Sequence, residues 1–365
     1  MSVLERVRHR ARLAPAPARV VLDHEDVVVH RGERSGADMI VAVHSTALGP
    51  ALGGVRMWAY PTALDALGDA LRLSAGMTYK AAAAGLDLGG GKGVIRAPVG
   101  NSPLEPSLRE EMLLDFGELV ESLDGSYITA EDVGTGTDDM TMIHSVTSHV
   151  TGLPPEDGGS GDPSPFTAMG VEAAIRACVA YRRGAPDLEG LHVVVVGLGH
   201  VGSRLAARLR ADGVRLTVAD ADPTKREVAE RLEARWVEPD VAMRTRCDVL
   251  APCALGGVID ESTLGSLGAG IVCGAANNQL SDERLAPKLA ERGVIYAPDF
   301  IANAGGLINV YRELRGLDED WAREHAAGIE SVMAKILATA EDRGIEPLSA
   351  AYEIARERLE HAVTH

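Results

Sequence analysis

Apolar and polar positions follow two periods along the chain, one typical of amphipathic helices and one of buried strands. Residues 62–77 place apolar side chains at helical spacing, with Thr62 as the expected N-cap and Asp65 three residues later. Residues 109–122 repeat this helical pattern. The run of valines at 193–196 has no polar position, which is typical of a strand covered on both faces of a parallel sheet.

The remaining segments continue this alternation of strands and helices. Further strands are expected at 38–43, 127–132, 215–220, 248–253 and 270–277, and further helices at 167–183 and from 318 to the end. A glycine-rich turn region is expected after residue 43. Strands that alternate with helices indicate an α/β fold.

A stretch rich in Gly, Pro, Ser and Asp divides the chain. Residues 152–166 contain these residue types at the density of a linker. The stretch predicts a boundary between one domain over 1–150 and a second over 151–339. The linker and residues 303–306 are the expected hinges of a domain movement.

The composition narrows the classes of function. The 365 residues include 36 Lys and Arg against 53 Asp and Glu, a formal net charge of −17. This balance argues against nucleic acid or an anionic membrane surface as a partner, because phosphates are bound by basic faces. No apolar run approaches the ~18 residues of a membrane span. The basic segment 1–21 lacks the apolar core of a secretory signal, so it is expected to be a short tail.

Cysteines and histidines do not show the spacing of a metal centre. His361 and His365 have HxxxH spacing, but they lie at the end of the chain, and we expect no metal site. The cysteines form no CxxC pair, which favours a reduced, cytoplasmic protein. They are Cys178, Cys247, Cys253 and Cys273.

A glycine-rich turn follows the buried valines directly. Gly197, Gly199 and Gly202 form a G-x-G-x-x-G pattern between a strand and a helix-forming run. The first glycine makes the turn, the second lets a pyrophosphate approach the backbone, and the third lets the helix pack close to the strand. His200 and Val201 then lie at the helix N-terminus, where free N–H groups face the phosphates. The alternative is a glycine turn that is only structural.

Asp220 ends the next predicted strand, 18 residues after Gly202. A carboxylate at this position accepts hydrogen bonds from a ribose hydroxyl and repels a 2′-phosphate, so the cofactor is predicted to be NAD rather than NADP. Asp222 and Lys225 lie nearby. The second domain is therefore expected to be a Rossmann-type NAD-binding domain, separated by a cleft from an N-terminal α/β substrate domain.

Two lysines lie in an apolar, glycine-rich stretch, and two acids follow a later strand. Lys80 and Lys92 are candidates for chemistry because lysine is seldom buried without a partner. A desolvated lysine acts as an acid or base near neutral pH, and a charged lysine can hold a carboxylate. Glu131 and Asp132 end the strand predicted at 127–132. The residues alone leave alternatives open: Lys80 can end a helix, Lys92 can be exposed and Asp132 can cap a helix.

Seven stretches closely resemble the glutamate/leucine/phenylalanine/valine dehydrogenase family, most of all its leucine and valine branch. They are HSTALGPALGGVRMW (44–58), GMTYK (76–80), GLDLGGGK (85–92), YITAEDVGT (127–135), APCALGG (251–257), CGAANNQL (273–280) and APDFIANAGGLINV (297–310). The resemblance extends over residues 38–360. It implies oxidative deamination of an L-amino acid by NAD to the 2-oxo acid, ammonium and NADH, and the reverse reaction. It also implies that the last helices, about 340–365, pack back on the first domain.

The resemblance also implies roles for individual residues. Lys80 would anchor the substrate carboxylate, Lys92 would activate the attacking water, and Asp132 would move protons to and from the substrate nitrogen. Contacts with the nicotinamide half of the cofactor or with substrate are implied for Thr167, Cys253, Ala254, Asn278 and Asn303. A nucleophilic role for Cys253 is disfavoured because no histidine partner is evident.

Matching positions also imply an apolar side-chain pocket. Its expected members are Leu52, Ala130, Leu307 and Val310, and Gly53 and Asn278 are also expected to bind the substrate. A pocket of this kind disfavours glutamate, because a buried unpaired charge is costly. The expected substrate is therefore leucine, valine or isoleucine, with phenylalanine or tryptophan as the alternative and a non-catalytic NAD-binding paralogue as a third. Ala81 and Val55 depart from the residues common in relatives, Asn and Thr, which bears on the substrate rather than the reaction. A homo-oligomer is expected.

Overall fold

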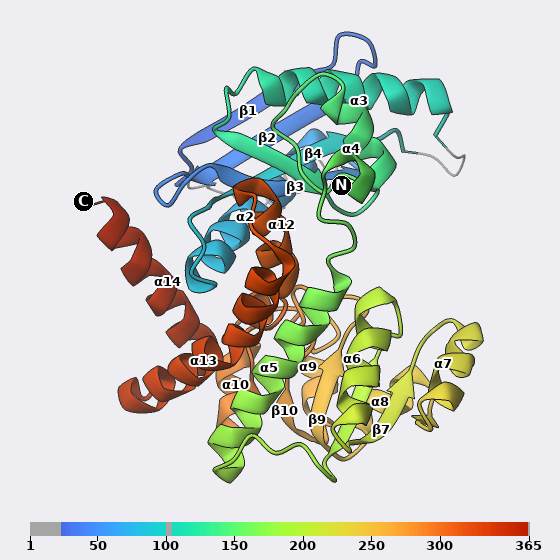
Figure 1. Cartoon of the computed structure of the whole chain (residues 1–365), viewed down its shortest axis with the longest axis vertical. Helices are drawn as coiled ribbons and strands as arrows, with labels where there is room; N and C mark the ends of the chain where they lie inside the picture. The colour runs from blue at the N-terminus through green and yellow to red at the C-terminus, as the bar shows by residue number, and fades with distance from the viewer. Residues whose placement is uncertain (1–22, 100–103, 364–365) are drawn as a thin grey trace, which may run out of the picture.

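Two separate β-sheets, each covered by helices, form the two halves of the molecule (Figure 1). The computed structural model describes residues 23–99 and 104–363. Both halves combine strands with helices, so the predicted α/β fold with two domains is confirmed. The basic tail at 1–21 and the terminal His365 lie outside the described residues.

The first sheet is mixed and has five strands. They are β1 (Asp26–Arg31), β2 (Asp38–Ser45), β3 (Ala51–Trp58), β4 (Gly89–Arg96) and β5 (Tyr127–Glu131), in the order β1-β2-β4-β3-β5. β3 runs parallel to β4 and β5, whereas β2 is antiparallel to β1 and β4. The expected turn region after residue 43 is wrong in part, because the glycines at 53 and 54 lie inside β3. There the lack of a Cβ allows close approach of β4 and β5.

Helices cover both faces of this sheet. They are α2 (Ala63–Ala83), α3 (Pro106–Glu121) and α4 (Thr137–His144). Ile40 of β2 packs in one cluster with Ala70 of α2, whereas the preceding residue, Met39, packs with Phe116 of α3. Successive strand residues point to opposite faces, so α2 lies on one face and α3 with α4 on the other.

Helix α2 carries the first candidate lysine. The predicted cap is confirmed, since Thr62 Oγ1 accepts a 3.2 Å hydrogen bond from Asp65 N–H and Thr62 N–H donates to the Asp65 carboxylate at 3.0 Å. The helix predicted at 62–77 continues to Ala83, which places Lys80 in its last turn.

The second sheet has six parallel strands. They are β6 (His192–Val196), β7 (Arg215–Ala219), β8 (Arg235–Trp236), β9 (Cys247–Pro252), β10 (Ala269–Val272) and β11 (Ile295–Tyr296), in the order β11-β10-β9-β6-β7-β8. The helical elements between them are α6 (His200–Ala211), η2 (Pro223–Lys225), α7 (Arg226–Arg231), α8 (Pro239–Arg244), α9 (Glu261–Leu264) and α10 (Leu285–Glu291), and α11 (Asp299–Ala302) follows β11. The valines at 193–195 are fully buried, as predicted for a central parallel strand.

One predicted strand of this domain is too long. The strand expected at 270–277 ends at Val272. Gly274 packs directly against Pro252, and Asn278 has a left-handed backbone with φ 51°. These two features turn the chain out of the sheet and form a loop at its edge.

The linker between the domains is shorter than predicted. Helix α5 (Ser164–Arg183) begins inside the expected linker 152–166, because Pro165 fits a first helical turn that needs no backbone donor. Before it, the loop contains the 3₁₀ turn η1 (Pro155–Asp157). The Glu313 carboxylate accepts hydrogen bonds from Gly152 N–H at 3.1 Å and from Ser160 N–H at 2.7 Å. One side chain therefore holds both parts of the linker.

Three helices complete the chain. They are α12 (Gly305–Arg315), α13 (Glu319–Arg343) and α14 (Pro347–Val363). α13 packs against α5, whereas α14 packs against α2 of the first domain (Figure 1). Arg358 of α14 donates hydrogen bonds to the carbonyls of Ala82 at 3.0 Å and Leu86 at 2.8 Å. The domain limits at 150 and 339 stay predictions.

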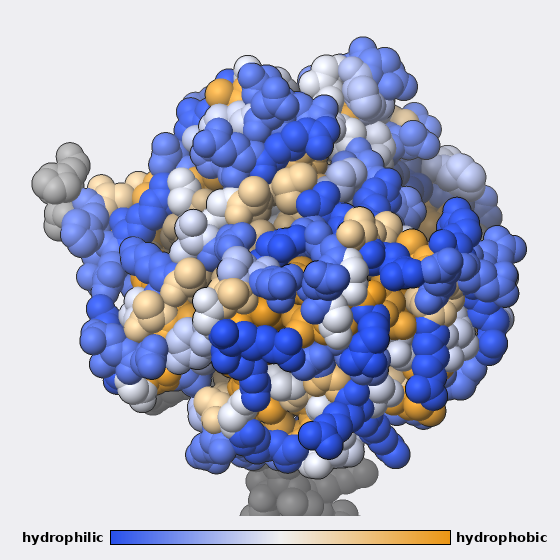
Figure 2. Space-filling view, turned by 60° about the horizontal axis from the view of Figure 1, so that its bottom comes forward, coloured by the Kyte–Doolittle hydropathy of each residue, from blue (hydrophilic) through white to orange (hydrophobic). Residues whose placement is uncertain are grey.

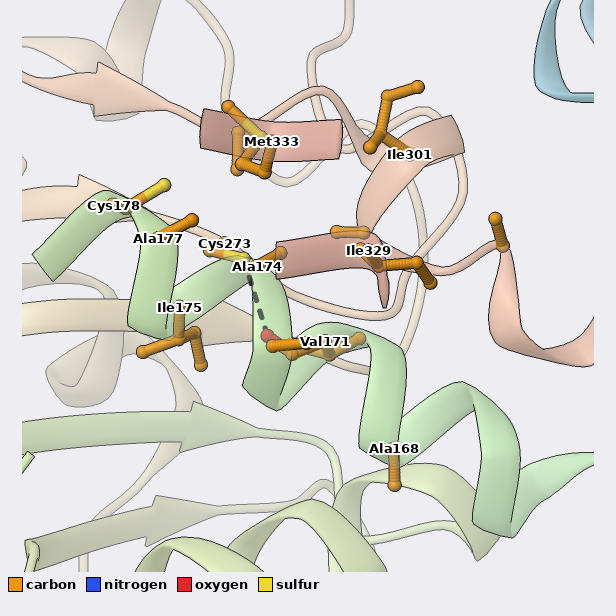
Figure 3. Packing of buried hydrophobic residues seen from close by; sticks show 14 of the residues in the cluster. Ala168, Val171, Ala174, Ile175, Ala177, Cys178, Cys273, Ile301, Ile329 and Met333 are labelled. Carbon is orange, nitrogen blue, oxygen red and sulfur yellow. Dashed lines mark hydrogen bonds between the residues drawn. The ribbon is translucent and has the colours of Figure 1, made fainter. Parts of the chain in front are cut away.

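Small side chains allow α5 and α13 to approach closely. Ala174 and Cys178 of α5 lie in one buried cluster with Ile329 and Met333 of α13 (Figure 3). The Cys273 thiol, next to this contact, lies 3.8 Å from the Val171 carbonyl.

On the face of the molecule shown in Figure 2, hydrophilic residues predominate and apolar residues form only short stretches. Within the described residues, no helix has the length and apolarity to cross a membrane.

Candidate active site

A buried lysine and a carboxylate form the centre of the candidate site. Lys92 lies on the central strand β4 and is only 5% exposed. Its Nζ is 3.0 Å from Asp132 Oδ2. Burial lowers the pKa of Lys92, and the neighbouring Asp132 charge only partly opposes this effect. A lysine held in this way can lose and regain a proton more readily than one in water.

Asp132 is placed by the loop that follows β5. Its backbone N–H donates to Thr135 Oγ1 at 2.9 Å, and that hydroxyl donates to the Val55 carbonyl at 2.9 Å. The carboxylate also accepts a 2.8 Å hydrogen bond from Arg56 Nε. Burial raises the pKa of Asp132, but the charges of Lys92 and Arg56 outweigh burial and hold that pKa below its usual value.

Lys80 supplies a second amine to the same region. It is half-buried in the last turn of α2. Burial lowers the pKa of Lys80 to about 8, with Lys92 acting in the same direction and the carboxylates of Asp299 and Asp132 opposing. Asp299 belongs to the second domain, at the start of α11. Both domains therefore contribute charges around Lys80.

The glycine turn of the second domain has the geometry that its sequence predicts. Gly197 has φ 101°, and a Cβ there would lie 2.7 Å from the Ala254 side chain. A Cβ on Gly202 would clash with the Gly197 carbonyl, so this glycine allows α6 to pack on the end of β6. A Cβ on Gly199 would meet no atom within 4 Å. The space beside Gly199 therefore fits the close approach of a ligand to the backbone.

Asp220 binds this turn directly. Its Oδ2 accepts a 2.6 Å hydrogen bond from Leu198 N–H, and its Oδ1 accepts one of 2.8 Å from Asp222 N–H. Each carboxylate oxygen can still accept a further hydrogen bond. His200 and Val201 begin α6 at the other side of the turn.

The loop after β10 is held by buried side chains. Asn303 Nδ2 donates to the Ala275 carbonyl at 3.2 Å and to Asn277 Oδ1 at 2.7 Å, whereas Asn303 Oδ1 has no partner although it is buried. Cys253, which follows the neighbouring strand β9, is partly buried, and burial raises the pKa of its thiol to about 12. A thiol of this kind is a poor nucleophile.

Comparison with known proteins assigns the chain to a family. The family model described as Glu/Leu/Phe/Val dehydrogenase, dimerisation domain, matches residues 17–149, and the model described as Glutamate/Leucine/Phenylalanine/Valine dehydrogenase matches residues 218–365. The chain belongs to this family of amino-acid dehydrogenases. The resemblance inferred from its motifs is thereby confirmed.

Individual relatives of this dehydrogenase cover almost its whole length. Leucine dehydrogenase of Bacillus subtilis is 44% identical over 93% of this chain and 92% of its own. Valine dehydrogenase of Streptomyces virginiae is 43% identical over 93% of this chain and 94% of its own. Among solved structures, L-tryptophan dehydrogenase from Nostoc punctiforme superimposes with a TM-score of 0.82 at 38% identity, over 100% of both chains.

The apolar residues predicted to line a substrate pocket come from both domains of this dehydrogenase. Leu52 of β3 and Leu307 of α12 belong to one buried cluster, with Val310 packed against it. Ala130 of β5 pairs in register with Gly54, one residue after Gly53. Thr167 lies beside Gly306, where a Cβ would be 2.9 Å from its hydroxyl. Asn278 lies on the loop described above.

Two charged residues of this dehydrogenase site were missed by sequence reasoning. Arg56 lies within the GGVRMW motif, and its charge in an otherwise apolar strand was the available signal. Asp299 lies in the APDF motif and accepts hydrogen bonds from Gln279 N–H at 3.2 Å and Phe300 N–H at 2.8 Å. Nothing in the local sequence indicates that Asp299 faces a lysine of the other domain. The described residues contain no group of three or more His, Cys, Asp or Glu side chains suited to a metal ion.

Proposed function

We propose that the protein catalyses NAD-dependent oxidative deamination of a branched-chain L-amino acid. An L-amino acid, NAD⁺ and water give the 2-oxo acid, ammonium, NADH and a proton, and the reaction is reversible. The observation that carries the proposal is the buried Lys92–Asp132 pair beside Lys80, in a chain 44% identical to a leucine dehydrogenase.

Lys80, Asp132 and Lys92 have different proposed roles in the reaction. Lys80 holds the substrate carboxylate, because a half-buried ammonium is a strong partner for an anion. Asp132 accepts a proton from the substrate ammonium, so that the nitrogen lone pair becomes available. Lys92 accepts a proton from the water that attacks the imine carbon, and later returns it to the leaving nitrogen.

The second domain has the features of a dinucleotide site. NAD, when bound, supplies the acceptor for the hydride from the substrate Cα. The pyrophosphate would lie at the start of α6, against the turn formed by Gly197, Gly199 and Gly202. Asp220 would accept a hydrogen bond from a ribose hydroxyl and would repel a 2′-phosphate. The buried Asn303 Oδ1 lacks a protein partner and is suited to a polar group of the nicotinamide half. Thr167, Cys253 and Ala254 complete this proposed half of the site.

The side chain of the substrate is proposed to lie among aliphatic groups. Leu52, Ala130, Leu307 and Val310 offer no charged partner, so a substrate carboxylate such as that of glutamate would be unpaired there. Tryptophan or phenylalanine is the second candidate, favoured by the tryptophan dehydrogenase that superimposes over the whole chain. A non-catalytic paralogue is disfavoured because Lys80, Lys92 and Asp132 are all present.

We also propose that the enzyme is a cytoplasmic homo-oligomer. The family model that matches residues 17–149 is described as a dimerisation domain, and a neighbouring structure is a hetero-hexameric glutamate dehydrogenase from Thermus thermophilus with a TM-score of 0.75. Among the described residues β1 pairs only with β2, so no strand of that part of the chain covers its outer edge. All four cysteines are free, as is usual in a reducing compartment.

A panel of L-amino acids tests the proposal. The purified protein is mixed with NAD⁺ or NADP⁺ and each amino acid at alkaline pH, and NADH formation is followed by absorbance. We expect the highest kcat/KM with leucine, valine or isoleucine. A higher value with phenylalanine or tryptophan would select the second candidate, and no turnover with any amino acid would contradict both.

A further inference from the structure

Five charged side chains alternate in sign from the candidate site towards the surface. They are Lys92, Asp132, Arg56, Asp69 and Arg72. The links beyond the Lys92–Asp132 pair are 2.8 Å from Arg56 Nε to Asp132 Oδ2, 2.8 Å from Arg56 Nη1 to Asp69 Oδ2, and 2.6 Å from Arg72 Nη2 to Asp69 Oδ1. Arg56 is the only one of these residues that bonds two carboxylates through different nitrogens.

The two oxygens of Asp132 have different surroundings. Oδ2 receives both Lys92 Nζ and Arg56 Nε. Oδ1 receives no hydrogen bond from the described residues, although the side chain is 22% exposed. Gly54 leaves room for this arrangement, since a Cβ there would lie 2.9 Å from Asp132 Cβ. One oxygen is therefore fixed, and the other is free to meet a ligand.

We infer that Arg56 is a positioning residue for proton transfer, because it fixes Oδ2 of Asp132 and leaves Oδ1 as the atom that exchanges a proton with the substrate nitrogen. The inference rests on the proposed function. In the step, an N–H bond of the substrate ammonium breaks as an O–H bond forms at Oδ1. The electron pair stays on nitrogen, and the proton passes from Oδ1 to solvent.

The anchor of Arg56 explains why an arginine is needed here. Asp69 Oδ2 also accepts a 2.6 Å hydrogen bond from the Tyr60 hydroxyl, which fixes the Asp69 carboxylate. This fixed carboxylate in turn binds the Arg56 guanidinium through Nη1. The planar guanidinium binds Asp132 through Nε and Asp69 through Nη1, so the two carboxylates are held in a fixed relative geometry. A lysine at this position would keep the charge but would lose this fixed geometry.

The charges around Asp132 decide the direction of the pH effect. Lys92 on β4, Arg56 on β3 and Lys80 on α2 are cationic and favour the ionised carboxylate. Tyr127 on β5 is neutral, since burial raises the pKa of its phenol, and Asp69 is largely compensated by Arg56 and Arg72. Loss of Arg56 therefore raises the pKa of Asp132, and less of the carboxylate is ionised as the pH falls.

Arg56→Gln tests the inference through its pH profile. We expect kcat to fall by roughly 10-fold or more, with the KM of the amino acid changed far less. The acid limb of the kcat/KM profile should move up by about one pH unit. Arg56→Lys should restore most of the acid limb but not kcat, because it keeps the charge and loses the fork.

Two further variants separate positioning from general damage. Asp69→Asn releases the anchor without touching Asp132, and we expect a smaller fall in kcat in the same direction. It also carries the test if Arg56→Gln fails to fold, which circular dichroism and thermal unfolding would reveal. Arg34→Gln is the matched control, since it breaks a 2.8 Å ion pair with Asp115 in the same domain, does not contact the five residues, and should leave the acid limb in place.

The outcomes distinguish this inference from the proposed function. If the wild-type protein oxidises no amino acid, the proposed function fails. If the wild-type protein is active and a folded Arg56→Gln variant, or Asp69→Asn in its place, keeps the wild-type kcat and acid limb, only the role of Arg56 is overturned. A uniform rise in KM with kcat and acid limb unchanged would also overturn it.

Discussion

The Asp299 carboxylate, at the start of α11 in the second domain, attracts the Lys80 ammonium at the end of α2 in the first domain. Asp299 is 9% exposed, and the backbone N–H groups of Gln279 and Phe300 hold its oxygens. No direct ion pair joins the two side chains. The charge of Lys80 therefore depends on a residue from across the domain boundary.

Asp299→Asn should make Lys80 easier to deprotonate. Removing the negative charge lowers the pKa of Lys80 further, by up to about one unit. The alkaline limb of substrate binding should move to lower pH by the same amount. Asp248→Asn is the control, because Asp248 also accepts a backbone N–H in the second domain, from His192 at 2.8 Å, but does not act on Lys80. Equal shifts in both variants would contradict the coupling.

Substrate binding should weaken as the pH rises through about 8, the pKa to which burial lowers Lys80. Lys80 is charged below this value and neutral above it, so the partner of the substrate carboxylate is lost on the alkaline side. A branched-chain fatty acid without an amino group can be titrated as a competitive inhibitor. We expect its inhibition constant to rise about tenfold per pH unit in the alkaline range. An inhibition constant that stays flat from pH 7 to 10 would exclude Lys80 as the anchor.

Lys92→Ala should abolish turnover without loss of cofactor binding. The side chain is the proposed base for the water, and a positioned base contributes roughly 10²–10⁴-fold to the rate. Lys92 lies on the sheet of the first domain, so the dissociation constant of NADH should stay within about twofold. Stopped-flow single turnovers measure the first quantity and fluorescence titration the second. Retained turnover would remove Lys92 from the mechanism.

Asp220→Ala should weaken NAD and reduce its preference over NADP. The carboxylate accepts the Leu198 N–H of the glycine turn, and it is the proposed acceptor for the ribose hydroxyl. We expect the ratio of kcat/KM for NAD to that for NADP to fall by roughly 10-fold or more, since a hydrogen bond to a charged group contributes about 1.5–3 kcal/mol. Asp220→Asn keeps one acceptor oxygen and should have an intermediate effect. An unchanged ratio in both variants would contradict the assignment.

Gly91→Ala should destabilise the first domain. A Cβ there would lie 2.5 Å from the ring of Tyr127, which is completely buried and has no room to move. Overpacking of this kind costs about 1–3 kcal/mol in the free energy of unfolding. Gly76→Ala is the matched control, because this glycine lies inside α2 with no atom within 4 Å of its added Cβ. It should gain up to about 1 kcal/mol from helix propensity, and urea unfolding compares the two.

The local pattern of apolar residues predicted the helices and strands in which that pattern is strongly periodic. It did not predict the strands in which glycines take the place of apolar residues. Strand β6 and helix α2 were predictable because their signals are local in the sequence: a run of valines in β6, and a Thr–Asp capping box before the amphipathic pattern of α2. β3 and β4 were missed because their glycines serve the packing of Tyr127 and of the adjacent strands, which is not a local property. Family motifs implied that Lys92 and Asp132 take part in one reaction, but no local pattern predicted their contact. Arg56 and Asp299 act across strands and domains, so no local period marks them.

The Arg358 contact with α2 has a consequence for motion. The chain passes between the domains in the linker around Ser160, and α14 returns to the first domain at a separate place. These two attachments lie apart, so rotation about the line that joins them is the easiest movement of one domain against the other. Lys80 and Lys92 would then travel along an arc about that line. Opening would also part Leu52 of β3 from Leu307 of α12, which share one buried cluster.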